Sequence, residues 1–294
     1  MLLDAATGAA LLPKRPFDGH KGTFGTLVCV CGSLDYAGAA LLCGMAAARA
    51  GAGLVALAVP ASLQPVLAGR VPELVTLGLP TLAGDIDARE SGHSLKSKSP
   101  DALVVGCGIS ESDGYRELVL GLIAREGPTM VVDGGALNLL AQSGRWWASS
   151  QRSCILTPHP GEYARLMGAP AGASDDEREA SARAAAERFG QVVVLKGART
   201  VIATPDGQTA VAPFANAALA TAGSGDVLAG TIGSLLAQKL APFDAARLGV
   251  WLHGRAAERL SERLGDSGLI ASDLPYEIAV ARRELAATVP TSRA

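Results

Sequence analysis

A glycine-rich loop runs directly into an apolar segment in the C-terminal half of the chain. Residues 216–230 read NAALATAGSGDVLAG, with Gly223, Ser224 and Gly225 just before an apolar helical pattern. Free N–H groups at a helix start, together with the positive end of the helix dipole, suit an anion such as phosphate. Asp226 falls in the first turn. It is either a simple helix cap or a carboxylate placed to take a proton from an attacking hydroxyl.

Two further segments place ionisable side chains directly after predicted strands. Residues 193–200 read VVLKGART, so Lys196 ends a strand, where it either neutralises phosphate oxygens or is simply solvated. Residues 157–162 read TPHPGE. His159 is held in a rigid turn between two prolines and is either structural or catalytic. Glu162 opens the next helix, where capping is the alternative to a functional role.

Three weaker segments also follow predicted strands. Residues 105–110 (VGCGIS) carry a G-x-G, and residues 32–39 (GSLDYAGA) lead into an alanine-rich helix. The G-x-G is a weak signal, because many strand-to-helix turns have the same pattern. Residues 32–39 suit close approach of a ligand to the backbone, but equally suit tight helix–sheet packing. Asp133 either orients a metal-bound water or phosphate or caps the following helix. Walker A, G-x-S-x-G and Rossmann fingerprints are absent from the sequence, so a bound nucleotide needs another architecture.

The order of the predicted elements brings these segments to a common location. Short apolar strands alternate with helical stretches, which predicts βαβ units and a mainly parallel sheet with helices on both faces. In such a sheet, ligands bind at the carboxyl ends of the strands. The predicted strands are 26–31, 54–59, 102–105, 130–133, 154–157 and 192–196, and the predicted helices between them are 37–50, 114–125, 136–142 and 175–189.

The pattern changes after Lys196. Residues 200–204 and 208–211, joined by PDG, predict a β-hairpin. Residues 84–100 include the polar, basic stretch HSLKSKSP and are interpreted as a surface loop. Since neither an internal repeat nor a credible linker occurs, residues 1–294 are interpreted as one α/β domain. The three helices predicted after the hairpin are 225–238, 243–264 and 272–285.

Composition narrows the class of protein. Hydrophobic residues make up 49% and charged residues 18%, which indicates a well-filled interior. The net charge of −2 leaves no positive field for nucleic acid. Residues 41–60 are too interrupted for a membrane span, and the first residues lack the pattern of a secretory signal. The five cysteines include Cys29 and Cys31, which lack partners for a zinc site. We interpret all five as buried free thiols in a reducing cytoplasm.

Taken in order, these segments resemble the NAD(P)H-hydrate dehydratase family, which belongs to the ribokinase-like fold, a three-layer sandwich. The resemblance covers residues 20–275 and rests on HKGTFGTLVCVCGSLDYAGAALL, GCGIS, DGGALN, LTPHPGEYARLMG, VVLKGARTVIATPDG, ATAGSGDVLAGTIGSLLAQ and HGRAAERLSERLGDSGLIASDL. It implies a hydro-lyase that restores NADH or NADPH from the S form of its hydrate. The nucleotide, ADP in bacterial members and ATP in eukaryotic ones, phosphorylates the hydrate's hydroxyl, and phosphate then leaves. Without the epimerase domain of some relatives, a stand-alone dehydratase is expected.

The resemblance also implies roles for particular residues. Asp226 would be the base on the hydrate's hydroxyl, and Gly223, Ser224 and Gly225 would form the anion hole. Magnesium would bridge phosphate oxygens through water and Glu162. The residues implied to contact the adenine nucleotide are Lys196, Gly197, Ala198, Arg199, Thr200 and Gly225, and those implied to contact the hydrate are Ala39, Gly108, His159 and Asp226.

The chain departs from the family pattern at three places. Gly135 stands where the usual DADALN has a second carboxylate, and Cys107 stands where proline is usual in G-P-G. Around the anion hole, alanine or leucine at 215, 217–219 and 222 replaces small, glycine-rich or methionine positions. These differences bear on nucleotide affinity and turnover rather than on the fold.

Two alternative functions remain open at this point. An ATP-dependent small-molecule kinase of the same fold would keep its phosphorylated product, although the combination of TPHPGE with HKGTFG favours the dehydratase. A non-catalytic nucleotide sensor is supported by Gly135 alone, while the retained Asp226, Lys196 and His159 speak against it. Alanine-rich helix faces and the family resemblance lead us to expect a homo-oligomer, such as a tetramer.

Overall fold

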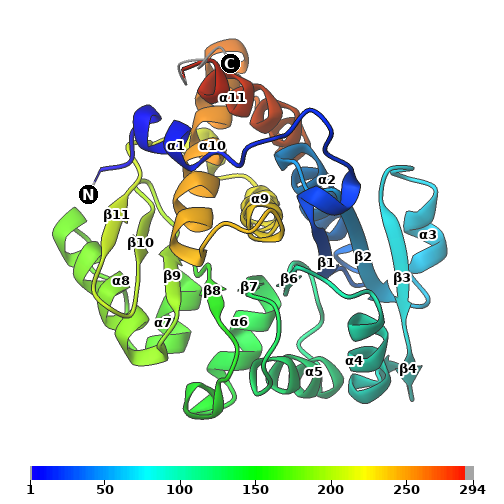
Figure 1. Cartoon of the computed structure of the whole chain (residues 1–294). Coiled ribbons are helices and arrows are strands. Elements are labelled where there is room, and N and C mark those ends of the chain that lie inside the picture. Colours follow the sequence, from blue (N-terminus) through cyan, green and yellow to red (C-terminus); the bar gives the residue numbers. More distant parts are fainter. Residues whose placement is uncertain (1, 289–294) are drawn as a thin grey trace.

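The computed structural model describes residues 2–288 and is built around a nine-stranded sheet (Figure 1). The strand order is β11-β10-β9-β8-β7-β6-β1-β2-β3. Neighbouring strands are parallel except at β10, which is antiparallel to both β9 and β11. The strands are β1 Thr26–Val30, β2 Leu54–Pro60, β3 Val75–Leu79, β6 Ala102–Val105, β7 Met130–Val132, β8 Cys154–Leu156, β9 Val192–Leu195, β10 Val201–Ala203 and β11 Thr209–Val211, with a separate ribbon of β4 Thr81–Leu82 and β5 Asp85–Ile86.

Helices cover both faces of this sheet, which gives three layers (Figure 1). One face carries α1 Ala5–Leu11, α2 Ala37–Ala50, α9 Ser224–Ala237, α10 Pro242–Leu264 and α11 Leu274–Thr288. The other carries α4 Ala88–Ser97, α5 Asp113–Ile123, α6 Gly134–Ala141, α7 Pro160–Met167 and α8 Asp175–Phe189. The short helix α3 Gln64–Ala68 lies at the β3 edge.

The sheet divides the hydrophobic core into two parts. Along β1, Leu27 and Cys29 belong to one cluster, whereas Val28 and Val30 belong to the other. This alternation follows because successive strand residues point to opposite faces. All four are fully buried, as expected for parallel strands covered on both sides. Within the first cluster, α9 is buried on all sides from residue 227 to residue 237, so it forms the centre of its layer.

The main features of the predicted fold are confirmed. The six predicted strands begin and end within one residue of their predicted bounds, and α2 and α8 have the predicted bounds. β10 and β11 form the predicted hairpin, and the sheet is mainly parallel with helices on both faces. The prediction omitted β3 and the short helices α1 and α3, since these peripheral elements have too few apolar positions to show a period.

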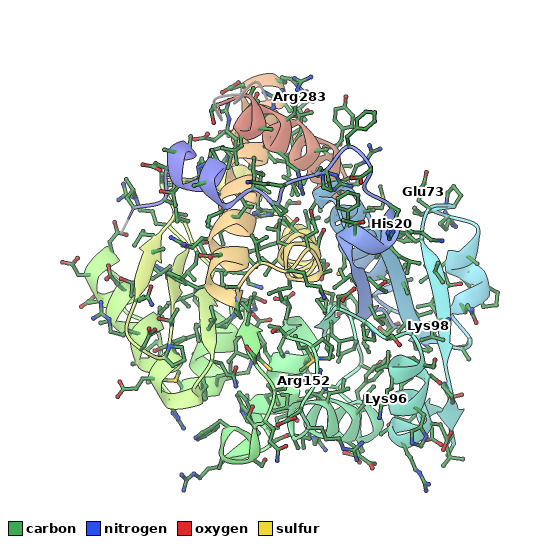
Figure 2. The ribbon with its side chains drawn as sticks, in the orientation of Figure 1. His20, Glu73, Lys96, Lys98, Arg152 and Arg283 are labelled. Carbon is green, nitrogen blue, oxygen red and sulfur yellow. The ribbon has the colours of Figure 1, made fainter. Side chains whose placement is uncertain are left out.

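The surface loop predicted at residues 84–100 is wrong, because this segment contains β5 and α4. The side chain of Asp87 accepts a hydrogen bond from the first turn of α4 and caps it. Ser91 and Leu95, four residues apart on one helix face, are the buried positions. Lys96 lies on this helix, far from α9 in the view of Figure 2. Two buried positions among polar residues make an apolar pattern too weak to recognise in the sequence.

The cysteine prediction is confirmed in its structural part. All five cysteines are buried and free. Cys29 and Cys31 face the same core cluster, as their spacing along a strand predicted. Among residues 2–288, helices that combine the length and the apolar character required to cross a membrane are absent.

A buried carboxylate joins the last two helices. Arg259 and Arg263 of α10 donate hydrogen bonds of 2.8 and 2.6 Å to the two oxygens of Glu277 on α11. The Glu277 side chain is only 2% exposed. Burial alone would raise the pKa of Glu277, but the two guanidinium groups hold it below its ordinary value.

We expect Arg259→Met to lower the free energy of unfolding by about 1–3 kcal/mol, because it leaves a buried carboxylate oxygen without its donor. Since folding lowers the pKa of Glu277, its contribution is present above the unfolded-state pKa and is lost as the pH falls. The difference in free energy of unfolding between the wild type and Arg259→Met should therefore become smaller in acid. Urea unfolding near neutral pH and in mild acid measures both effects. Arg183→Met, which removes an exposed pair on α8, is the control, and an equal loss in both variants would contradict the prediction.

Candidate active site

The glycine-rich loop forms an anion cradle, residues 223–225, at the start of α9. Gly223 has φ +90°, a left-handed conformation that favours glycine. The Ser224 hydroxyl donates a 2.8 Å hydrogen bond to the carbonyl of Leu219, which fixes the loop against the helix start. Because the first N–H groups of a helix lack intrahelical acceptors, this end of α9 presents donors and a positive dipole. One of these donors, the Ser224 N–H, makes a 3.3 Å hydrogen bond to the Thr221 carbonyl. The predicted phosphate-type site therefore has the required backbone geometry.

Lys196 follows β9, and its ammonium group lies beside the anion cradle. Arg178 of α8 donates a 3.1 Å hydrogen bond to the Lys196 carbonyl and holds the main chain there. The Lys196 Nζ lies 2.7 Å from Asp133 Oδ1 and 3.7 Å from Glu162 Oε2. A Cβ placed on Gly225 would come within 3.3 Å of this Nζ. Lys196 is thus an internal cation between two carboxylates and the start of α9, rather than a solvated lysine at a strand end.

Asp133, which follows β7, anchors this lysine. Its carboxylate is almost completely buried, and its Oδ1 accepts hydrogen bonds from Thr157 Oγ1 at 2.6 Å and from Lys196. Its Oδ2 lies 3.7 Å from Cys107 Sγ, whose thiol donates to it. The side chain makes no capping bond to α6. Of the two alternatives for Asp133, capping is therefore wrong, and the carboxylate instead orients Lys196.

His159 and Glu162 form a capping box at the start of α7. The His159 Nδ1 accepts from the backbone N–H groups of Gly161 and Glu162, at 3.0 and 3.4 Å. In return, Glu162 Oε2 accepts from the His159 N–H at 2.7 Å. Both residues therefore have the structural role of helix caps, and Glu162 in addition faces Lys196. Burial raises the pKa of Glu162 to about 7, although the charge of Lys196 opposes the rise.

Asp226 has the electrostatic character of a base that works near neutral pH. Its carboxyl is partly buried in the first turn of α9. Burial, followed by the negative charge of Asp133, raises the pKa of Asp226 to about 7. A carboxylate with this pKa binds a proton more readily than an ordinary aspartate, and catalytic bases are most efficient when their pKa lies near the working pH.

A cavity of about 750 Å³ opens beside Lys196 and the start of α9. Most of its wall is apolar, with a few polar groups on the strand-end side, which is typical of a small-molecule site. Among the predicted nucleotide contacts, Arg199 does not line it and instead pairs with Asp175 of α8 at 3.1 Å. The predicted site residues that line the cavity are His159, Lys196, Gly197, Ala198, Thr200, Ser224 and Gly225.

The residues predicted to contact the hydrate fall in two places. His159 lines the cavity. At the second place, Gly108 has φ +67° and lies against the start of α2, since a Cβ on it would come within 2.6 Å of the Ala39 Cβ. Asp226 lies near the second of these places, because its carboxylate lies within 4.8 Å of the Cys107 Sγ, next to Gly108 in the chain.

Sequence reasoning missed the part of the cavity wall that α10 contributes. Val250, His253 and Gly254 line the cavity together with Phe214. A Cβ on Gly254 would come within 2.1 Å of the Phe214 ring, so only glycine leaves room for it. Burial lowers the pKa of His253 to about 4, and its Nε2 lies 3.0 Å from the Ser224 carbonyl. The neutral ring therefore donates to the anion cradle's backbone. The available signal was the adjacent pair His253 and Gly254 on the apolar face of a helix that also carries many charged residues, and such a pair indicates burial rather than a ligand site.

We expect Gly223→Ala to weaken nucleotide binding at the anion cradle while the protein stays folded. Left-handed backbone costs a non-glycine residue about 1–2 kcal/mol, and the added Cβ would lie 2.5 Å from Leu42 Cδ1. Nucleotide affinity, measured by calorimetry, should fall about 10-fold or more, since every 1.4 kcal/mol is tenfold in affinity. Gly207→Ala, at φ +87° in the distant hairpin turn, is the matched control for backbone strain. Equal nucleotide affinity in the two variants would contradict the prediction.

The sheet order and the anion cradle beside a strand-end lysine place this protein in the ribokinase-like class. A ribokinase-like superfamily protein of Enterococcus faecalis V583 has the same fold, with a TM-score of 0.82 at 24% identity over 97% of this chain and 96% of that one. The ADP/ATP-dependent NAD(P)H-hydrate dehydratase of Bacillus subtilis, co-crystallized with ATP/Mg²⁺, is similar with a TM-score of 0.84 and 30% identity over 96% and 97% of the two chains.

Sequence comparison gives the family. The family model described as NAD(P)H-hydrate dehydratase matches residues 27–279. The ADP-dependent (S)-NAD(P)H-hydrate dehydratase of Neisseria meningitidis serogroup B is 39% identical over 290 residues, covering 97% of this chain and 93% of that relative. The chain also spans about half the length of the bifunctional NAD(P)H-hydrate repair enzymes it matches in Moorella thermoacetica and Gloeobacter violaceus, 52% and 53% respectively. The chain belongs to the NAD(P)H-hydrate dehydratase family.

Proposed function

We propose that this protein is a hydro-lyase that uses ADP to dehydrate the S form of NADH or NADPH hydrate, releasing AMP and phosphate. The observation that carries the proposal is the position of Asp226, a carboxyl with a pKa raised to about 7 at the anion cradle of a nucleotide-sized cavity. The names of the relatives from Neisseria meningitidis and Bacillus subtilis support the substrate and the phosphoryl donor.

In this proposal, Asp226 accepts the proton of the hydrate's hydroxyl as that oxygen attacks the terminal phosphorus of ADP. The bond from this phosphorus to the bridging oxygen breaks, and AMP leaves. The backbone N–H groups of Gly223 and Gly225 and the Lys196 ammonium stabilise the charge on the transferred group, and the Ser224 N–H joins them when it exchanges the Thr221 carbonyl for the phosphate. The carbon–oxygen bond then breaks with loss of phosphate and of a ring proton, which restores the double bond. Phosphate is a far better leaving group than hydroxide.

The adenine nucleotide is proposed to lie in the 750 Å³ cavity along Lys196–Thr200 and Gly225. Lys196, Gly197, Ala198 and Thr200 line that cavity, and Arg199 extends the same turn outward toward α8. The hydrate is proposed to contact Ala39, Gly108, His159 and Asp226. The apolar wall from Leu228 and Val250 suits a purine ring.

Magnesium is proposed to bind mainly to the phosphate oxygens, with Glu162 acting through water. Glu162 supplies the hard carboxylate oxygen that Mg²⁺ prefers, but its Oε2 already accepts from the His159 N–H and faces Lys196. Direct ligation would compete with both contacts, so contact through water fits the donor set better. The ion would neutralise phosphate charge when bound. The Bacillus subtilis relative was co-crystallized with ATP/Mg²⁺.

We also propose that residues 1–294 act as one domain in a homo-oligomer, such as a tetramer, in the cytoplasm. Five buried free thiols support a reducing compartment. The alanine-rich helices and the family resemblance support association with further copies. Light scattering of the purified chain measures the number of copies.

The decisive experiment incubates purified protein with magnesium, S-configured NADH hydrate and either ADP or ATP while NADH absorbance is followed. Recovery of absorbance supports the dehydratase, and the faster nucleotide identifies the donor. The R-configured hydrate is the matched control. If nucleotide binds but absorbance does not return with either donor, the proposal fails in favour of a small-molecule kinase with another substrate.

The pH dependence of turnover tests Asp226 as the base. Since the base must be ionised and its pKa is raised to about 7, kcat/KM should rise with pH along a limb centred near 7 rather than near the ordinary aspartate value of about 4. Glu162 has a pKa raised to about 7 as well, so Glu162→Gln is the necessary comparison. The limb should remain in that variant, slightly displaced to lower pH. Its disappearance would assign the limb to Glu162 instead.

A further inference from the structure

A thiol and two carboxylates converge beneath the start of α9. Cys107 follows β6, Asp133 follows β7, and Asp226 lies in the first turn of α9. The ligand atoms of these three side chains all lie within 4.8 Å of one another. We propose that they form a binding site for a thiophilic divalent cation, with Zn²⁺ as the type case, distinct from the magnesium that accompanies the nucleotide.

The separations within this group match tetrahedral zinc coordination. Zinc–sulfur and zinc–carboxylate bonds of about 2.3 and 2.1 Å place neighbouring sulfur and oxygen ligands about 3.6 Å apart. The Cys107 Sγ already lies 3.7 Å from Asp133 Oδ2. A cation can therefore enter between these two atoms with little change in their positions. Asp226 supplies the third ligand after a small movement, and water supplies a fourth.

The fold holds the two inner ligands in place before any ion arrives. Cys107 is fully buried, and its carbonyl accepts a 2.8 Å hydrogen bond from the N–H of Gly32. Asp133 is held through its other oxygen, Oδ1, by Thr157 and Lys196. Its Oδ2 therefore remains turned toward the thiol. Rigid ligands lower the entropy cost of binding a metal, as in designed sites whose ligands are locked by neighbouring contacts.

The donor set selects against magnesium. A thiolate with two carboxylates suits zinc, cobalt or cadmium, whereas Mg²⁺ takes oxygen ligands almost exclusively. Binding releases the thiol proton to solvent, so the three ligands contribute three negative charges. Together with the dication and the Lys196 ammonium, the group sums to zero when the neighbouring Glu162 carries a proton, which its raised pKa of about 7 favours. Charge neutrality matters here because an unbalanced charge in a buried site is costly.

Asp226 is the member of the group that solvent reaches. Cys107 and Asp133 are buried, whereas Asp226 is partly exposed, so the ion enters past Asp226. Once bound, it occupies the carboxylate that would accept the substrate's proton. The cation is thus an inhibitor that competes with the hydrate. This inhibitory consequence rests on the proposed function of Asp226, whereas binding of the ion does not.

Cobalt binding tests the site without any reference to activity. Co²⁺ added to the purified protein should give the near-ultraviolet charge-transfer band of a cobalt–thiolate bond, and Zn²⁺ should displace it. Cys107→Ala should abolish the band and weaken zinc binding by at least the roughly 10–100-fold that loss of an outer-sphere partner causes. Cys107→Ser replaces only the sulfur, so it should also lack the band, and circular dichroism should show that it is folded like the wild type. Cys154→Ser removes another buried thiol outside the group and should retain the band.

A wild-type protein without the band at saturating Co²⁺, or a band that persists in Cys107→Ala, overturns the site. For inhibition, zinc should slow NADH recovery in the wild type and in Cys154→Ser, with at least a 10-fold weaker effect in Cys107→Ala relative to its own uninhibited rate. Equal zinc sensitivity in all three overturns the inhibitory link. A band in a protein that never restores NADH would refute the proposed function and leave the site intact.

Discussion

Asp226→Asn is expected to abolish turnover while nucleotide binding is largely retained. The amide has nearly the same shape as the carboxylate but cannot accept the proton of the hydrate's hydroxyl, so kcat should fall by at least the ~10²–10⁴-fold that general-base catalysis contributes. Asp226 does not line the nucleotide cavity among the residues described for it, and ADP affinity measured by calorimetry should change little. Near-wild-type kcat in this variant would remove Asp226 from the mechanism.

The same substitution is expected to stabilise the protein, which separates loss of catalysis from loss of fold. The pKa of Asp226 is higher in the folded chain than in the unfolded chain, so its favourable contribution is present in acid and is lost as the pH rises through about 7. Above that pH, the folded protein carries a poorly solvated charge. The melting temperature of Asp226→Asn should therefore exceed that of the wild type more at mildly alkaline pH than in acid. Differential scanning calorimetry at two pH values measures this difference.

Lys196→Met is expected to have the second large effect, on both binding and stability. It removes the cation beside the anion cradle and leaves Asp133 and Glu162 buried without their counter-charge. Loss of one partner of a buried ion pair costs about 3–5 kcal/mol of unfolding free energy. ADP affinity should fall strongly, since a phosphate contact with a charged donor is also lost. Urea unfolding and calorimetry with ADP measure the two losses.

A double variant tests the physical cause of that loss. Asp133→Asn combined with Lys196→Met removes both charges of the closest pair, so part of the stability should return relative to Lys196→Met, while ADP affinity should not. Arg183→Met, which removes an exposed pair with Glu179, should cost less than about 1 kcal/mol. If the double variant were less stable than the sum of its single variants, the buried-charge argument would be wrong.

The fold and the position of the site followed from local sequence signals because both depend on short-range patterns. Apolar strands and the glycine loop before α9 are recognisable within a few residues, and parallel strands bring their carboxyl ends to one edge. These signals were sufficient to predict that Lys196, His159 and Gly225 lie together, and all three line one cavity.

The remaining parts of the site depend on contacts that sequence spacing does not specify. Asp133 lies 63 residues before Lys196, and only the register of β7 to β9 brings the carboxylate to the ammonium. His253 reaches the anion cradle from a helix that follows it in the chain. Helix α4 was missed for a local reason, since only Ser91 and Leu95 are buried in it and the rest of the segment is polar.

Because α9 is buried on all sides, the N-terminus that it offers to ligands is rigid. A helix enclosed from residue 227 to residue 237 cannot shift its N-terminus without disturbing the core, so the main chain of residues 223–225 is already in place before an anion arrives. Ordering of these groups was completed during folding, and binding loses little further conformational entropy there. Specificity at this end of the cavity is therefore that of a rigid template, and adaptation to different substrates must come from the surrounding loops.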